Sequence, residues 1–410
     1  MPNEQDSSAK SARSKTRAGG DKPKTSAKGK PVSIASARKP RTWRDNALLG
    51  IGILIISSMG LSLVAPFLQS AAPAPTAPAT EPPTPTPLPT PIADLNSITF
   101  ENRLLHPSGL FSVGQPKGWT PFTSQSTPQE VQITLRNDAA LSVVEYRMVR
   151  PETPPSSGSD VSAFFTSSWL AASWRDYTRW TEETRQVQGN DLVMDFSLER
   201  GAQRFIARQL AFTDGTYIYG VRVVAPPNAA DMVRYIVENA RSTFEVNNQF
   251  ADIPLEWKGY YDASYGHLLR YPSSWTLDDF AEGAPASFSA DGGITLRLEA
   301  QSAPQVSDES QARAFVEAAI SGARIRSVQT REQFGKPAYF VSYSAQTVDG
   351  DPISGLALLI PDENRVHLAN LRLTGQDVDL NESSSDTTIN RARQVVETLA
   401  LLQIDATVVR

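Results

Sequence analysis

Four aromatic side chains lie close together in the first half of the chain and could form a binding surface: Trp169, Trp174, Tyr177 and Trp180. If this stretch is helical, Trp169 shares a core-facing side with Phe165, and Trp174 lies about 140° away. We therefore expect Trp174 to be exposed. Trp174, Tyr177 and Trp180 could then line a groove that stacks on glycan rings or packs against a protein partner. Packing in the core is the alternative.

A metal site is suggested only by the segment Asp377 to Asn381, where oxygen-bearing side chains alternate as in an EF-hand loop. Glu382 stands where that loop needs a glycine, and Thr388 stands where it needs a bidentate glutamate. We therefore predict no metal site, and instead an acidic loop that caps the last helix through Asp386 or Thr387.

Other catalytic signals are weak. The chain has no cysteine, which excludes disulfides, thiolate metal sites and a cysteine nucleophile. It has 3 histidines. His106, His267 and His367 are widely separated and are expected at polar strand or loop positions. Adjacent acids at 278–282 could act as catalytic carboxylates, but no motif identifies a substrate. We predict no catalytic residue and no cofactor, and an enzyme is the less favoured reading.

An uncharged segment of 22 residues, Ala47 to Leu68, predicts a transmembrane helix over 47–68. At 1.5 Å per residue it spans about 33 Å, enough for a bilayer core of about 30 Å. A cleaved signal peptide and a buried core helix are the alternatives. Basic residues just before the segment place the N-terminus in the cytoplasm and the following chain outside it.

The segments on either side of this helix differ in charge and composition. Residues 1–46 hold 12 Lys/Arg and 4 Asp/Glu, a net charge of +8, and are expected to be a disordered cytoplasmic tail. The tail could bind anionic lipid, but without interleaved aromatics we expect no specific nucleic-acid binding. Residues 69–96 form a linker rich in Pro, Thr and Ala, with 9 prolines in 71–92. An extended polyproline helix there would reach about 70 Å.

An internal repeat begins near residue 97. Pro116-x-x-Trp119 recurs as Pro272-x-x-Trp275, an offset of 156. We interpret each Pro as the end of a strand and each Trp as a core anchor.

The same order of elements follows in each copy: a strand, a capped helix, an antiparallel meander and an amphipathic helix. The expected first-copy ranges are 131–135, 161–172, 192–198, 205–212, 217–224 and a helix through 232–240. The expected second-copy ranges are 294–298, 312–320, 338–343, 354–360, 366–373 and a helix through 389–402.

This order, with its Pro-x-x-Trp motif, resembles the PsbP and Mog1-like α/β/α sandwich, with one copy over 97–247 and one over 252–410. The resemblance implies an α+β fold of two tandem sandwich domains with antiparallel sheets. In the family this fold serves accessory or binding roles, including photosystem-associated extrinsic proteins and a partner of a small GTPase. It transfers no functional residue to this chain.

The sequence thus predicts a single-pass protein of the cell membrane, held in the bilayer through residues 47–68. Its two extracytoplasmic domains are expected to act as a non-catalytic binding or scaffold module for a protein partner in the envelope or in a membrane complex. Two alternatives stay open: a hydrolase or transferase that acts on envelope material through carboxylates, and a transmembrane signalling protein.

Overall fold

The computed structural model describes residues 92, 94–250, 252–302 and 306–409. The predicted tail (1–46) and transmembrane helix (47–68), and nearly all of the predicted linker (69–96), lie outside the described residues. Among the helices within the described ranges, none combines the length and the apolar character that a membrane span requires. The described chain is α+β, with two large antiparallel sheets and few helices.

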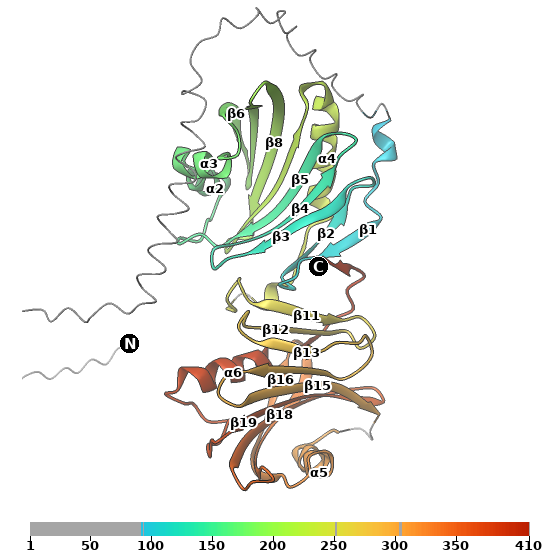
Figure 1. Cartoon of the computed structure of the whole chain (residues 1–410), viewed down its shortest axis with the longest axis vertical. Coiled ribbons are helices and arrows are strands. Elements are labelled where there is room, and N and C mark those ends of the chain that lie inside the picture. The colour runs from blue at the N-terminus through green and yellow to red at the C-terminus, as the bar shows by residue number, and fades with distance from the viewer. Residues whose placement is uncertain (1–91, 93, 251, 303–305, 410) are drawn as a thin grey trace, which may run out of the picture. The chain divides into compact units, whose positions relative to one another are not determined.

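The first half of the described chain folds into a hairpin, a seven-stranded antiparallel sheet and three helices (Figure 1). The sheet order is β3-β4-β5-β9-β8-β7-β6. The elements are β1 (Asn102–Leu105), β2 (Phe111–Gln115), β3 (Thr120–Ser126), β4 (Glu130–Asn137), β5 (Ser142–Val149), α2 (Gly158–Phe164), α3 (Ser167–Ser173), β6 (Arg179–Gln188), β7 (Asp191–Arg200), β8 (Gln203–Thr213), β9 (Ile218–Ala225), α4 (Ala230–Ser242) and β10 (Glu245–Val246).

The second half repeats this plan with a sheet of order β13-β14-β15-β19-β18-β17-β16. Its elements are β11 (Lys258–Asp262), β12 (His267–Tyr271), β13 (Thr276–Asp279), β14 (Ala286–Ala290), β15 (Ile294–Ser302), α5 (Glu309–Ala319), β16 (Arg324–Gln333), β17 (Lys336–Gln346), β18 (Pro352–Asp362), β19 (Arg365–Thr374), α6 (Thr387–Glu397), β20 (Ala400–Leu401) and β21 (Thr407–Val408). Every strand of the second sheet occupies the place of the strand ten numbers earlier in the first. The repeat read from the sequence is therefore a duplication of topology.

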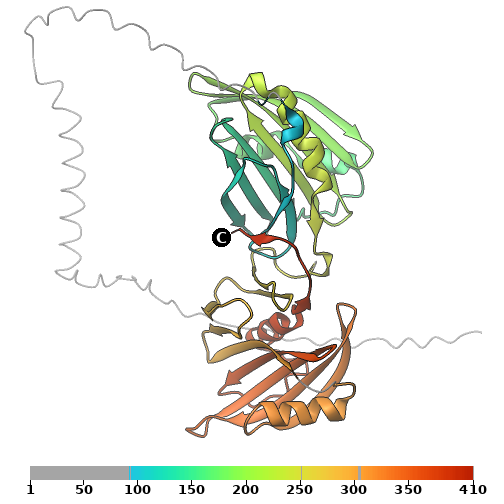
Figure 2. The ribbon, with the colours of Figure 1, turned by 90° about the vertical axis from the view of Figure 1, so that its right-hand side faces the viewer.

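Helices cover both faces of the first sheet (Figures 1 and 2). The apolar side of α4, including Met232, Ile236 and Val237, packs with alternate residues of β4, β5 and β9. The opposite face carries the alternating apolar residues of β7, among them Met194 and Phe196, which pack beneath α2 and α3. In the second half, α6 and α5 belong to two separate apolar clusters in the same way.

Both Pro-x-x-Trp motifs form the same turn. The backbone N–H of Trp119 donates to the carbonyl of Pro116, and that of Trp275 donates to the carbonyl of Pro272, each at 3.0 Å. Strand β2 ends one residue before Pro116, and both indole rings are buried. The predicted anchoring role is confirmed.

The helix predicted over 161–172 is in fact two short helices. Phe165 ends α2 with a non-helical backbone, and the Thr166 side chain accepts the N–H of Trp169 at 3.2 Å to begin α3. A threonine oxygen that caps a new first turn competes with continuation of the old helix. In the second copy, Asp308 caps the single helix α5, and Asp386 caps α6 as predicted.

The last strand returns to the first half. Within the compact unit Pro85–Arg410, β21 pairs in parallel with β1, through Leu104 with Thr407 and Leu105 with Val408. The short strands β10 and β20 occupy matching places, because each pairs with the second strand of its own hairpin. The boundaries 97–247 and 252–410 stay a prediction.

Candidate ligand-binding site

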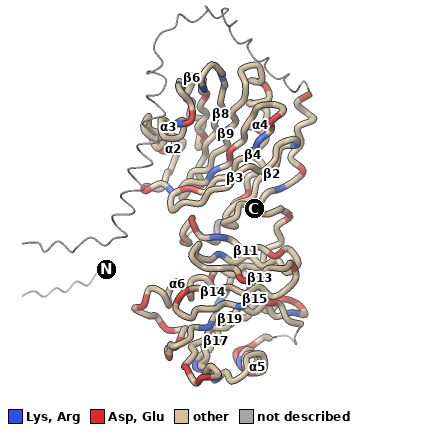
Figure 3. The backbone as a smooth tube through the Cα atoms, viewed as in Figure 1, with Lys and Arg blue, Asp and Glu red and all other residues tan. Residues whose placement is uncertain are grey.

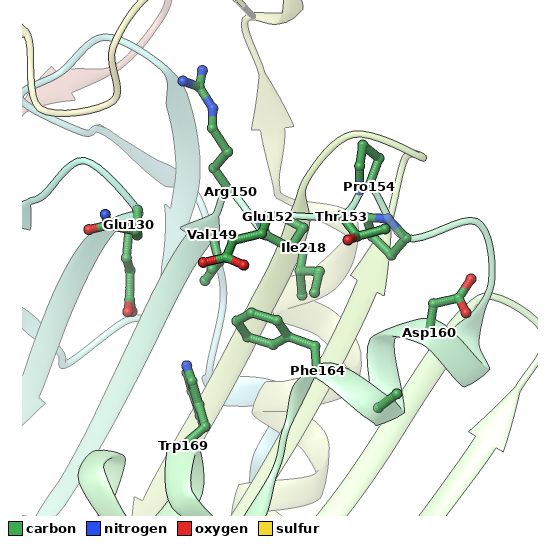
Figure 4. Close-up of a pocket in the computed structure, with 14 residues that line it drawn as sticks. Glu130, Val149, Arg150, Glu152, Thr153, Pro154, Asp160, Phe164, Trp169 and Ile218 are labelled. Carbon is green, nitrogen blue, oxygen red and sulfur yellow. The ribbon is translucent and has the colours of Figure 1, made fainter. Parts of the chain in front are cut away.

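A cavity of about 580 Å³ opens at one end of the first sheet, beneath the loop that leads from β5 into α2 (Figure 4). Its size falls in the range of ligand sites in proteins, about 300–1,000 Å³. The lining combines an apolar floor, two aromatic rings and several carboxylates. Half of its residues belong to β4, β5, β9, α2 and α3, and most of the others belong to the loop 150–155.

The floor follows from strand register. Glu130 of β4 pairs with Val149 of β5, and Val149 pairs with Ile218 of β9. Directly paired residues point to the same face of a sheet, so the three side chains form one row under α2 and α3. Val149 and Ile218 are buried, whereas Glu130 is partly exposed at the end of the row.

The aromatic wall depends on the break between α2 and α3. Phe164 lies in the last turn of α2 and Trp169 in the first turn of α3, with ring centroids 5.8 Å apart. Phe165, between them, is buried against the sheet and meets Trp169 edge to face at 4.7 Å. The break thus lets Phe164 and Trp169 both line the cavity (Figure 4).

Three carboxylates surround the cavity: Glu130, Glu152 and Asp160. Asp160 accepts hydrogen bonds from the backbone N–H and the hydroxyl of Ser156, at 2.9 and 2.7 Å, and from the Ser157 hydroxyl at 3.0 Å. These hydrogen bonds, led by the one from the Ser156 hydroxyl, lower the pKa of the Asp160 carboxyl below its usual value. Asp160 is therefore ionised at neutral pH.

The guanidinium of Arg150, the basic residue at the rim, binds groups other than the cavity carboxylates. Its guanidinium donates to the Tyr217 hydroxyl at 2.8 Å and to the Ile253 carbonyl at 3.1 Å. Figure 4 shows this side chain pointing away from Phe164. Within the described part of the chain, no ion pair joins Arg150 to Glu152 or Asp160.

A network of buried charges continues from the cavity along the same face of the sheet. Glu130 pairs with Arg147, with 3.2 Å between Oε1 and Nη1. Arg147 Nη2 donates to Glu145 at 2.9 Å, and Arg222 Nε donates to the same Glu145 oxygen at 2.6 Å. The network links the rim of the cavity to the middle of the sheet.

Electrostatics and aromatic packing hold this network in place. Burial alone would raise the pKa of Glu145, but the charges of Arg222 and Arg147 outweigh it and lower the pKa below its usual value. Burial lowers the pKa of Arg222 to about 10, which leaves it charged at neutral pH. Arg147 lies over the Trp169 ring at 5.3 Å and Arg222 over the Trp174 ring at 4.1 Å. The two arginines thereby help to fix α3 and the cavity wall.

The predicted exposure of Trp174 is wrong. Trp174 is 1% exposed and packs edge to face on Phe196 and Tyr177. The angular estimate placed Trp169 on the core-facing side with Phe165. Because a new helix, α3, begins at Ser167, its buried positions are instead Leu170 and Trp174, four residues apart. Tyr177 and Trp180 are half-buried against the same cluster. Glycan or partner binding by Trp174, Tyr177 and Trp180 stays a prediction.

The histidines and the acidic loop occupy structural positions. His106, His267 and His367 are all buried, and His267 Nε2 lies 2.7 Å from His367 Nδ1. This pair was missed in the sequence, because 100 residues separate its members. In the acidic loop, Asp379 accepts hydrogen bonds from the Ser327 hydroxyl and its own neighbour Asn381. Among the described residues, no three His, Asp or Glu side chains are grouped so as to hold a metal ion.

Sequence reasoning also missed the cavity. The available signal was the segment Pro151-Glu-Thr-Pro-Pro155, which must cross between a strand and a helix without forming either. Its proximity to Phe164 and Trp169, and to the distant row of Glu130 and Ile218, could not be read from spacing alone.

The sequence matches no model of a known protein family and no curated protein. Its structure is similar over 35% of this chain to cyanobacterial PsbP (CyanoP) from Synechocystis sp. PCC 6803, of which 92% is covered, with 15% identity and a TM-score of 0.27. It is also similar over 75% of this chain to the immunity protein TplEi of the T6SS from Pseudomonas aeruginosa in complex with "L" peptide, of which 100% is covered, with 9% identity and a TM-score of 0.21. The expected resemblance to PsbP is thus found over part of the chain. At these values neither similarity assigns a function.

Proposed function

We propose that this chain is a membrane-anchored, extracytoplasmic binding protein with two tandem PsbP-like α/β/α domains, and that the cavity of the first domain is its binding site. The observation that carries the proposal is the construction of that cavity. Its floor is a buried row of the sheet, its wall is formed by two rings, and a charge network fixes one of those rings from behind. Concave, largely apolar sites with a few placed polar groups are typical of ligand binding.

Occupation of the cavity can be tested by filling it. Ala163 lines the cavity on the exposed side of α2, so Ala163→Trp adds bulk there without entering the core. Ala318→Trp, at an exposed position of α5, is the matched control. Crosslinking of the full chain in intact cells, followed by affinity capture, should recover a stoichiometric neighbour. We expect Ala163→Trp to lose this neighbour and Ala318→Trp to keep it. Equal recovery by both variants would remove the cavity from the proposal.

The membrane anchor rests on the uncharged segment 47–68 and the basic residues that precede it. A full chain with tags at both ends should stay in the membrane fraction after carbonate extraction. In intact cells, added protease should remove the C-terminal tag and spare the N-terminal one. Release of the chain into the carbonate supernatant, or protection of both tags, would contradict the anchor.

A further inference from the structure

The cavity has an excess of negative charge that the protein does not neutralise. Glu130 shares its charge with Arg147, and the Arg150 guanidinium is bound to Tyr217 and Ile253. Glu152 and Asp160 also line the cavity, and neither forms an ion pair with a described residue. Over the rest of the described chain, acidic and basic residues are interspersed (Figure 3). The cavity thus favours a ligand that brings its own positive charge.

The apolar part of the lining requires a ligand that carries apolar groups as well as a positive charge. The half-buried rings of Phe164 and Trp169, with Pro151 and Pro154 of the loop above them, present apolar surface that a bare metal ion or a short polyamine would leave uncovered. Lysine and arginine side chains carry an alkyl stem below a cationic head, so the stem can pack on apolar surface while the head meets carboxylates. A cationic head also stacks favourably on aromatic rings.

We propose, building on the proposed function, that the cavity takes a lysine or arginine side chain of a peptide segment in a protein partner. Lipid headgroups are the other abundant source of apolar cations. In choline and ethanolamine lipids, however, a phosphate lies next to the ammonium group, and Glu152 and Asp160 would repel it. A basic side chain flanked by apolar residues carries no such anion.

The test uses the full chain in detergent micelles and arrays of acetylated hexapeptides with apolar flanking residues. One central position is arginine, lysine, citrulline or glutamate; citrulline keeps the shape of arginine without its charge. We expect the arginine and lysine pools to bind about tenfold more tightly than the citrulline pool, and the glutamate pool not to bind. This preference should weaken as salt is raised.

Charge removal at the rim provides the decisive variant. Glu152→Gln with Asp160→Asn should lower binding of the arginine pool about tenfold and abolish its advantage over citrulline. Glu238→Gln with Glu317→Gln removes two exposed helical carboxylates that make no ion pair with a described residue, and should leave binding unchanged. A thermal melt of each variant checks that it is folded.

Three outcomes would overturn the inference, and they separate it from the proposed function. Equal binding of the arginine and citrulline pools, abolished by Ala163→Trp, would keep the cavity as a binding site and reject the cationic ligand. Binding of phosphatidylcholine vesicles that Ala163→Trp abolishes, without peptide binding, would assign a lipid instead. Absence of binding by every pool would reject the peptide ligand. If Ala163→Trp also recovered the crosslinked neighbour as well as the unaltered chain does, the cavity would be rejected as a binding site too.

Discussion

The guanidinium of Arg222 lies 4.1 Å from the centre of the Trp174 indole ring, and both side chains are buried beneath the end of α3. The same guanidinium donates to Ser173 at 2.6 Å. One cation therefore joins the ring, the helix end and the carboxylate of Glu145. Because α3 also carries Trp169, the position of the cavity wall depends on contacts made in the middle of the sheet.

Removal of the buried ring tests this dependence. We expect Trp174→Ala to lower the free energy of unfolding by about 3–5 kcal/mol, because it leaves a large cavity and an unstacked cation. Trp180→Ala, at a half-buried position, should cost less. Urea unfolding followed by circular dichroism measures both variants. Similar losses for the two would show that Trp174 has no special role in holding α3.

Removal of the shared carboxylate should be at least as damaging. Glu145→Gln leaves Arg147 and Arg222 buried without their common anion, and breaking a buried pair in this way typically costs about 3–5 kcal/mol. The control is Asp138→Asn, which breaks the exposed Arg136–Asp138 pair at 2.7 Å and should change the stability by less than about 1 kcal/mol. The midpoints of urea unfolding measure the stability of both variants against the unaltered chain. A loss for Glu145→Gln as small as that for the control would contradict a structural role for the network.

Much of the fold could be predicted from the sequence because its signals are local. Alternation along β7, the capping residue Asp308 and the apolar stripe of α4 each act within a few residues. The repeat could be read because the Pro-x-x-Trp turn needs the same two residue types in both copies.

The cavity could not be predicted in this way, since its parts come from distant strands and from a helix break. Thr166 ends one helix and starts another, and this shifts Trp169 and Trp174 away from the positions that a continuous helix would give them. The row of Glu130, Val149 and Ile218 depends on strand register, which the alternating pattern alone does not specify.

The buried histidines predict a loss of stability in mild acid. Burial lowers the pKa of His106 and His367 to about 4 and that of His267 to about 3, with a neighbouring Asp362 partly opposing the effect at His367. Below about pH 6.5 the unfolded chain binds protons at these imidazoles while the folded chain does not. The contribution of the neutral histidines to the free energy of unfolding should therefore be fully present above pH 6.5. It should fall as the pH drops toward 4, by up to about 1.4 kcal/mol per pH unit for each histidine.

Replacement of one histidine isolates its share of this effect. His106 Nδ1 accepts the N–H of Ser108 at 3.0 Å, an interaction that an asparagine oxygen can imitate. In His106→Asn, the free energy of unfolding should fall less steeply between pH 6.5 and 4.5 than in the unaltered chain. Urea unfolding at half-unit pH steps gives both slopes. Identical slopes would mean that His106 does not stay neutral in the folded state.

The close packing of Gly355 against Tyr343 gives a prediction for the second sheet. A Cβ at Gly355 of β18 would overlap the ring of Tyr343 on β17, whose hydroxyl donates to Asn370 at 2.6 Å. Gly355→Ala should therefore lower the free energy of unfolding by about 1–3 kcal/mol, because the ring must move and lose this hydrogen bond. In a double-mutant cycle, Gly355→Ala should cost much less when Tyr343 is already Ser, since no ring is left to displace. If the double variant lost as much free energy of unfolding as the two single variants together, the ring would not require the glycine.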